Sequence, residues 1–134
     1  MSKRDDALIE AAISAMPHAY APYSQFHVGA AICDEHGQIH TGVNVENAAY
    51  PQGACAEAGA IAAMVMAGGR NITAVAVAGG GVLLCTPCGG CRQRLREFGS
   101  PEMPIIICGP DGERARYSLA ELLPHSFGPD NLDQ

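Results

Sequence analysis

Two cysteines separated by two glycines have the types and spacing for chemistry. Cys88 and Cys91 follow Pro87, where a short helix is expected to begin. Thiols three positions apart share one face of a helix, and the positive end of the helix dipole favours their thiolate form. A Cys-x-x-Cys motif alone fits two chemistries, a redox-active dithiol or one half of a zinc site.

A third cysteine favours the zinc interpretation. Cys55 also lies where a helical pattern begins, because Ala56, Glu57 and Ala58 follow it directly. Three thiolates at two helix N-termini would bind zinc tetrahedrally and leave one position open. An open position is typical of a zinc ion that activates water rather than one that only holds a fold together.

Glu57 is the candidate proton carrier. It lies two residues beyond Cys55, so it can occupy the first turn of the helix beside the metal without binding it. A carboxylate next to a metal-activated water can take a proton from that water and return it to a substrate. The alternative is an exposed acid that the helix dipole stabilises. Its position after a candidate ligand favours the catalytic interpretation.

The remaining cysteines and the five histidines are expected to be structural residues or to lie on the surface. Cys33 and Cys108 fit buried, unreactive thiols. Cys85 forms a second Cys-x-x-Cys motif with Cys88, but Pro87 keeps this segment extended, so we do not expect Cys85 to bind metal. No histidine lies two residues before a candidate Glu.

The surrounding sequence alternates between helical and strand periodicity. Helices are expected at residues 8–16, 55–67 and after 87, with a last turn at 118–123, and strands at 26–32, 39–45, 72–78, 105–108 and 113–117. A helix between two strands indicates a crossover unit. The fold class is therefore α/β, with a mixed five-stranded sheet covered by helices on both faces.

Composition limits the alternatives. With 134 residues, 48% hydrophobic and 16% charged, the chain is expected to form a single domain over residues 1–134. No apolar run approaches the ~20 residues that cross a bilayer, and the N-terminal residues lack the apolar stretch of a secretory signal. A net charge of -6 disfavours nucleic acid as a partner. We expect a cytoplasmic protein with reduced thiols.

Several further segments accompany the cysteines along nearly the whole chain. They are Ala21-Pro22-Tyr23-Ser24-Gln25-Phe26, Val28-Gly29-Ala30-Ala31, Gly42 to Tyr50, Cys88 to Gln93, and Glu121-Leu122-Leu123-Pro124 with Phe127. Together with Cys55-Ala56-Glu57, these segments resemble the short cytidine deaminases, which belong to the zinc deaminases. The resemblance implies a three-layer α/β/α fold.

The resemblance also implies a role for individual residues. Cys55, Cys88 and Cys91 would bind zinc, and Glu57 would carry protons. Contacts with a nucleoside would come from Phe26, Asn44, Glu46, Ala48, Tyr50, Ala56, Thr86 and Phe127. The Asn44 amide and the Glu46 carboxylate suit the ribose hydroxyls, which both donate and accept hydrogen bonds.

Backbone groups and neighbouring subunits complete this implied site. The Ala56 backbone would meet the base edge, and the Thr86 carbonyl would face the leaving ammonia. In the family, the positions of Ala48, Tyr50 and Phe127 line sites across subunit boundaries. The short three-cysteine members are tetramers, so the resemblance implies a homotetramer.

The expected reaction is hydrolytic deamination of cytidine and 2'-deoxycytidine, which yields the uridine product and ammonia in pyrimidine salvage. An alternative is a deaminase of another aminopyrimidine nucleoside, such as blasticidin S, but the ribose pair favours ordinary nucleosides. Editing of RNA or DNA is disfavoured by the acidic charge. A non-catalytic zinc module, in which the metal only stabilises the fold, would bind zinc but would show no turnover.

One position departs from the family pattern. Many short cytidine deaminases carry an Arg directly after the catalytic Glu, where it offsets part of the thiolate charge, whereas this chain has Ala58. Three thiolates around a divalent ion leave a net negative site. The two helix N-termini and Arg92 are the candidates for the compensating charge.

Overall fold

Five strands form one mixed sheet in the computed structural model, which describes residues 2–133. They are β1 (Val28–Asp34), β2 (Ile39–Val43), β3 (Ile72–Gly79), β4 (Pro104–Gly109) and β5 (Gly112–Ser118). Their order across the sheet is β2-β1-β3-β4-β5, in which only the β3 and β4 pair is parallel. The expected mixed five-stranded sheet is confirmed.

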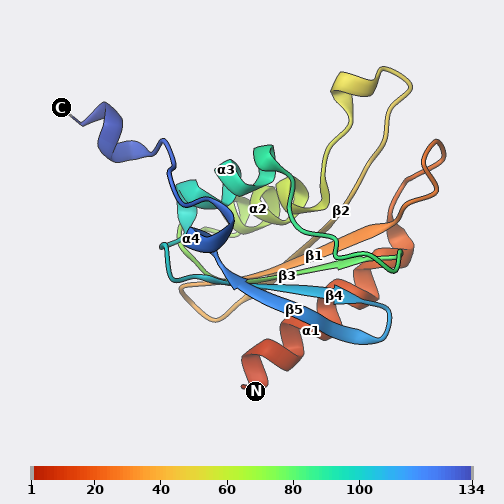
Figure 1. Cartoon of the computed structure of the whole chain (residues 1–134), viewed down its shortest axis with the longest axis horizontal. Coiled ribbons are helices and arrows are strands. Elements are labelled where there is room, and N and C mark those ends of the chain that lie inside the picture. The colour runs from red at the N-terminus through yellow and green to blue at the C-terminus, as the bar shows by residue number, and fades with distance from the viewer. Residues whose placement is uncertain (1, 134) are drawn as a thin grey trace.

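Helices cover both faces of this sheet. The α-helices within residues 2–133 are α1 (Lys3–Ala15), α2 (Ala56–Met66), α3 (Gly89–Phe98) and the short α4 (Leu119–Leu122). Helix α1 lies against one face, and α2 and α3 lie against the other (Figure 1). The three-layer arrangement is therefore confirmed. Among the helices of this part of the chain, none is long and apolar enough to cross a membrane.

Strand β1 is buried along its whole length because both of its faces are covered. Ala31 packs in the cluster that contains Leu8 of α1, whereas Ile32 packs in the cluster that contains Met64 of α2. Successive side chains of a strand point to opposite faces, so small and branched apolar residues alternate between the two layers. The sheet thereby separates two apolar cores.

The topology brings the starts of α2 and α3 to the same end of the sheet. Strands β2 and β3 are both antiparallel to β1, so they run in the same direction, and β4 is parallel to β3. Helix α2 connects β2 to β3, and α3 connects β3 to β4. Both helices therefore begin after the carboxyl ends of strands, where open α/β sheets bind ligands.

A glycine allows α2 to approach the sheet closely. A Cβ atom at Gly42 of β2 would lie 2.3 Å from the carbonyl oxygen of Ala56 and 2.4 Å from the backbone nitrogen of Ala60. No side chain fits between the strand and the first turns of the helix. Gly42 thus fixes the height of the α2 N-terminus above the sheet.

The first strand is shorter than its pattern predicts. The alternation from Phe26 predicted a strand from residue 26, but β1 begins at Val28 and Phe26 lies in a loop. The physical cause is the Asn44 side chain, whose Oδ1 accepts from the Val28 N–H at 2.9 Å and whose Nδ2 donates to the Phe26 carbonyl at 2.8 Å. Gln25 also has a left-handed backbone, with φ 63°. Side-chain bonds therefore replace the strand ladder here.

A partly buried ion pair joins α1 to β5, and it predicts a pH dependence of stability. Asp5 accepts hydrogen bonds from Arg116 at 2.8 Å and from Arg4 at 3.1 Å. Burial acts to raise the pKa of Asp5, but these two guanidinium groups outweigh it and the pKa is lowered. A carboxyl whose pKa is lower in the folded state stabilises that state above the unfolded pKa, near 4, and loses this effect as pH falls through the folded pKa.

Asp5→Asn is accordingly expected to lower the free energy of unfolding by about 1 kcal/mol at pH 7, a modest value because both arginines are partly exposed. Urea midpoints of the parent and the variant, measured between pH 7 and pH 3, should converge as the pH falls below about 4. A difference of the same size at pH 7 and pH 3 would contradict the ion-pair account.

Candidate active site

Three thiols meet at the N-termini of α2 and α3. The Sγ atoms of Cys55, Cys88 and Cys91 all lie within 4.8 Å of one another, and those of Cys55 and Cys88 are 3.9 Å apart. Tetrahedral zinc with Zn–S bonds of about 2.3 Å places its sulfurs about 3.8 Å apart. The three thiols therefore fit zinc in number, element and spacing.

Their positions follow from the local backbone. Cys55 and Cys88 are the N-cap residues of α2 and α3, and both have extended backbones. Neither side chain caps its helix, so both thiols remain available to a metal. Cys91 lies in the first turn of α3 and is buried. The thiol at each helix start is thus at least partly exposed, whereas the third thiol is buried.

The thiols differ in their electrostatic surroundings. A hydrogen bond from the Cys91 backbone N–H lowers the pKa of the Cys88 thiol, as expected at a helix N-terminus. Burial raises the pKa values of Cys55 and Cys91. Zinc binds thiolates, so burial makes the loss of the proton that accompanies zinc binding harder at Cys55 and Cys91 than at Cys88.

Glu57 is buried beside this cluster, with 4% of its surface exposed. It lies in the first turn of α2, where we expected it, and it is not one of the three clustered ligands. Burial raises its pKa above the ordinary value, although the Cys91 thiol and the Arg94 charge act in the opposite direction. A buried carboxyl whose pKa is raised holds its proton more readily than an ordinary carboxyl does, which suits a general acid/base.

A cavity of about 200 Å³ opens next to the thiols. Six of its lining residues were expected at the site, and two were not. The expected ones are Asn44, Cys55, Ala56, Glu57, Thr86 and Cys88, and the additional ones are Val28 and Cys85. Cys85 contributes to the wall and lies outside the cluster of three thiols. Burial raises its pKa to about 11, so it remains a neutral thiol at physiological pH.

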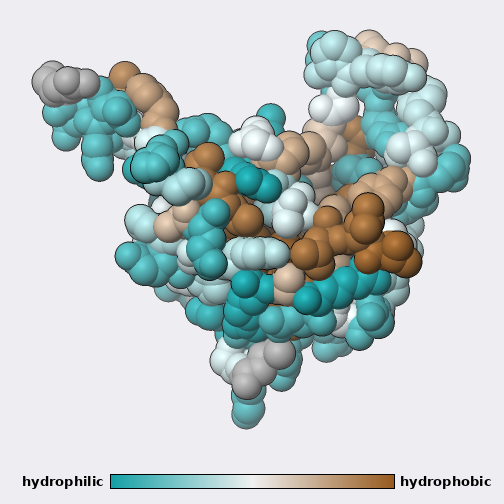
Figure 2. All heavy atoms as spheres, in the orientation of Figure 1, coloured by the Kyte–Doolittle hydropathy of each residue, from teal (hydrophilic) through white to brown (hydrophobic). Residues whose placement is uncertain are grey.

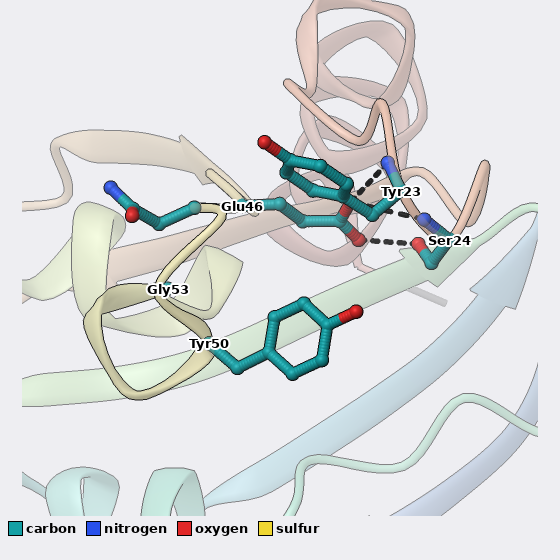
Figure 3. Close-up of a pocket in the computed structure, with 6 residues that line it drawn as sticks. Tyr23, Ser24, Glu46, Tyr50 and Gly53 are labelled. Atoms are coloured by element: carbon teal, nitrogen blue, oxygen red, sulfur yellow. Dashed lines mark hydrogen bonds between the residues drawn. The ribbon is translucent and has the colours of Figure 1, made fainter.

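A second hollow, of about 350 Å³, is lined by Tyr23, Ser24, Glu46, Asn47, Tyr50 and Gly53. Figure 3 shows the Glu46 carboxylate directed at the turn that carries Tyr23 and Ser24. It accepts from the backbone N–H groups of both residues, at 3.0 and 3.1 Å, and from the Ser24 hydroxyl. The Ser24 hydrogen bond is the largest of the contacts that lower the pKa of Glu46, which keeps it ionised.

Asn44 and Glu46 thus both hold backbone segments. The Asn44 amide uses one donor and one acceptor on the backbone, and an amide offers two of each. It can therefore still bond a ligand in the cavity that it lines. An ionised carboxylate likewise offers about four acceptor positions, so Glu46 retains capacity for a ligand.

Three expected substrate residues lie apart from both hollows. Phe26 is 41% exposed, and its ring lies over Gly79 and Gly81. Ala48 is exposed in the loop before α2, and Phe127 is 57% exposed in the C-terminal segment. Within a single chain, these three side chains line neither of the two hollows.

Arg92 and Arg94 of α3 have different partners: Arg92 bonds to backbone carbonyls, and Arg94 bonds to one of the clustered thiols. Arg92, a candidate for offsetting the thiolate charge, donates instead to the carbonyls of Pro87 at 2.8 Å and Leu122 at 2.9 Å. Arg94 donates from Nη1 to the Cys91 Sγ at 3.7 Å. Sequence reasoning missed Arg94, although its position three residues after Cys91 on a helix was the available signal.

The family model described as the cytidine and deoxycytidylate deaminase zinc-binding region matches residues 2–107. This segment includes the β2–α2 and β3–α3 connections and all three clustered thiols. The chain therefore belongs to the cytidine and deoxycytidylate deaminase family. Its members are zinc-dependent hydrolases, and zinc is the cofactor of this chain.

Individual relatives are similar to this chain over almost its whole length. A cytidine deaminase of Sporosarcina psychrophila is 39% identical over 127 residues, which cover 95% of this chain and 93% of that protein. A cytidine deaminase of Mycobacterium tuberculosis is 41% identical over 121 residues, or 90% and 87% of the two chains. The crystal structure of cytidine deaminase from Burkholderia pseudomallei superposes with a TM-score of 0.86 at 41% identity, covering 95% and 100%.

Proposed function

We propose that this chain deaminates cytidine and 2'-deoxycytidine hydrolytically, giving uridine or 2'-deoxyuridine and ammonia in pyrimidine salvage. The observation that carries the proposal is a buried glutamate beside three clustered thiols, at a cavity open to a ligand. A purely structural zinc site would have its coordination closed by protein ligands. Turnover of cytidine, followed by the loss of ultraviolet absorbance, tests the proposal.

In this proposal Cys55, Cys88 and Cys91 hold the zinc ion. Their number leaves one tetrahedral position for a water, and their placement at helix N-termini favours the thiolates that zinc requires. When bound, zinc lowers the pKa of such a water toward neutrality.

Glu57 carries the protons of the reaction. Its position in the first turn of α2, beside the ligands but outside the cluster, lets it reach a water near the thiols and the N3 and amino group of a cytosine ring. As the water oxygen bonds to C4, Glu57 would take one proton from the water and give it to N3. Glu57 would then take the second proton from the new C4 hydroxyl and deliver it to the amine, which leaves as ammonia when the C4–N bond breaks. One carboxyl thus serves several successive proton transfers.

Backbone groups in the cavity walls would recognise the substrate. The Ala56 backbone, at the start of α2, would meet the base edge, and the Thr86 carbonyl would accept a hydrogen bond from the leaving ammonia. Arg92 supports this wall, since it donates to the Pro87 carbonyl and ties it to Leu122. The loop that carries Thr86 is therefore fixed to α4.

Asn44 and Glu46 would bind the ribose hydroxyls. Asn44 lines the cavity beside the thiols and Glu46 lines the neighbouring hollow, so a nucleoside whose base lies at the thiols would extend toward Glu46. A vicinal diol can donate to the Glu46 carboxylate and accept from the Asn44 amide. Phe26, whose side chain lines neither hollow in the free chain, would pack against the bound nucleoside.

We also propose that the active protein is a homotetramer in the cytoplasm. Val82 and Leu83, in the β3–α3 loop, are 90% and 82% exposed, and Figure 2 shows apolar side chains gathered over this loop. Tyr50 is 79% exposed on a loop that projects from the body (Figure 1). Such exposed apolar surface supports contact with further copies. Six free cysteines favour a reducing compartment.

A site completed by a neighbouring copy predicts complementation. In this arrangement Ala48, Tyr50 and Phe127 would contact a nucleoside bound to another subunit. Mixing an inactive Glu57→Gln chain with a weakened Phe127→Ala chain under conditions of subunit exchange should raise turnover above the sum of the separate samples. Mixed oligomers would contain sites with an intact Glu57 and an intact Phe127. Full activity in a demonstrably monomeric sample would contradict shared sites.

A further inference from the structure

Arg94 makes a contact that the proposed reaction does not use. Its Nη1 atom donates to the Cys91 Sγ at 3.7 Å, and the rest of the side chain is exposed on α3. Within residues 2–133, it is the one side-chain cation that hydrogen-bonds to any of the three clustered thiols. The contact places a permanent positive charge against the most buried of them.

The local backbone leaves room for this contact. A Cβ atom at Gly90 would lie 3.3 Å from Nη1 of Arg94, tighter than most side-chain contacts. Gly90 therefore lets the guanidinium reach back along α3 toward its N-terminus. Long helical side chains are directed this way, so a residue three positions after a thiol can cover it.

The charge balance of the site explains why the contact between Arg94 and Cys91 matters. A divalent ion with three thiolates carries one net negative charge, and Glu57 adds a nearby acid. Ala58 cannot neutralise it, and the guanidinium of Arg92 is directed to backbone carbonyls. A hydrogen bond from a cation to a ligand sulfur stabilises a negative metal centre.

We propose that Arg94 is the positioning residue that offsets the negative charge of the zinc-loaded site, from α3 rather than from the position after Glu57. This inference rests on the proposed assignment of Cys55, Cys88 and Cys91 as the zinc ligands. Arg94 touches a ligand and not the substrate. It acts through the thiolates, by favouring their loaded form.

Zinc affinity measured by competition with a chromogenic chelator at pH 7 tests this role without any substrate. Arg94→Gln removes the charge, and Arg94→Lys retains it on a shorter side chain. Arg96→Gln is the matched control, because Arg96 lies on the same helix and bonds to the Ser126 hydroxyl at 2.9 Å instead of to a thiol. Thermal unfolding of the zinc-free chains shows whether each variant folds like the parent.

Arg94→Gln is expected to weaken zinc binding at least about tenfold. This is the lower end of the loss in metal affinity that follows when a group supporting a metal ligand is removed. Arg94→Lys should recover part of the loss, and Arg96→Gln should bind zinc like the parent. Adding Ala58→Arg to Arg94→Gln should restore affinity, because the new guanidinium lies in the turn that follows Cys55. Equal affinities for the parent and Arg94→Gln would overturn the inference while leaving the proposed reaction intact. A parent chain that binds no zinc would overturn both.

Discussion

Glu57→Gln is expected to lower kcat for cytidine by at least about 10³-fold while zinc content and nucleoside binding remain near normal. General acid/base catalysis alone is worth about 10²- to 10⁴-fold, and one carboxyl that serves several proton transfers should lie toward the upper end. The amide preserves the volume of a side chain that is almost fully buried, so the cavity should keep its shape. It cannot carry the proton. The loss should therefore fall on kcat rather than on binding.

Steady-state kinetics with zinc analysis of the same sample check this expectation. The nearby acid Glu46 is the natural comparison, because Glu46→Gln alters a carboxyl of the neighbouring hollow and should mainly raise KM. If Glu57→Gln turned over cytidine within tenfold of the parent, about 1.4 kcal/mol in barrier, another group would have to carry the proton.

Cys88→Ala is expected to abolish zinc retention and activity together. Cys88 begins α3, and its Sγ lies 3.9 Å from that of Cys55, so its loss removes one of three protein ligands. Two thiols cannot provide the three-ligand set of a catalytic zinc site. Zinc content by atomic emission and cytidine turnover, measured on the same preparation, should fall in parallel.

Cys85→Ala is the matched control for this loss. Cys85 lines the same cavity but lies outside the thiol cluster, so its removal should leave zinc content unchanged. The double variant Cys85→Ala/Cys88→Ala excludes Cys85 as a substitute ligand. A full zinc complement in that double variant would contradict the assignment of Cys88.

The metal cluster could be predicted from sequence because its determinants are local. Each cysteine stands where a helical pattern begins, and a helix start orients a side chain through backbone geometry that the pattern itself reveals. The α/β crossover order then brings the two helix starts to one end of the sheet. The position of Glu57 beside the metal ligands could be predicted from its spacing to Cys55 alone.

Other features depend on contacts between distant segments. The Asn44 side chain ends the pairing of β1 by bonding Phe26 and Val28, which lie 18 and 16 residues away, and no periodicity records such a bond. The same holds for Arg92, whose bond to Leu122 spans 30 residues and removes it from the thiols. Tertiary hydrogen bonds decide these positions, and residue type alone does not.

The most direct test of the central claim is turnover of cytidine by the zinc-loaded parent chain. Absorbance and released ammonia should be followed in one sample. Deamination predicts that the ultraviolet absorbance of cytidine falls while ammonia and uridine appear in equal amounts, and that removal of zinc by a chelator stops both. A folded chain with one zinc ion per subunit that leaves cytidine and 2'-deoxycytidine unchanged would contradict the proposed function.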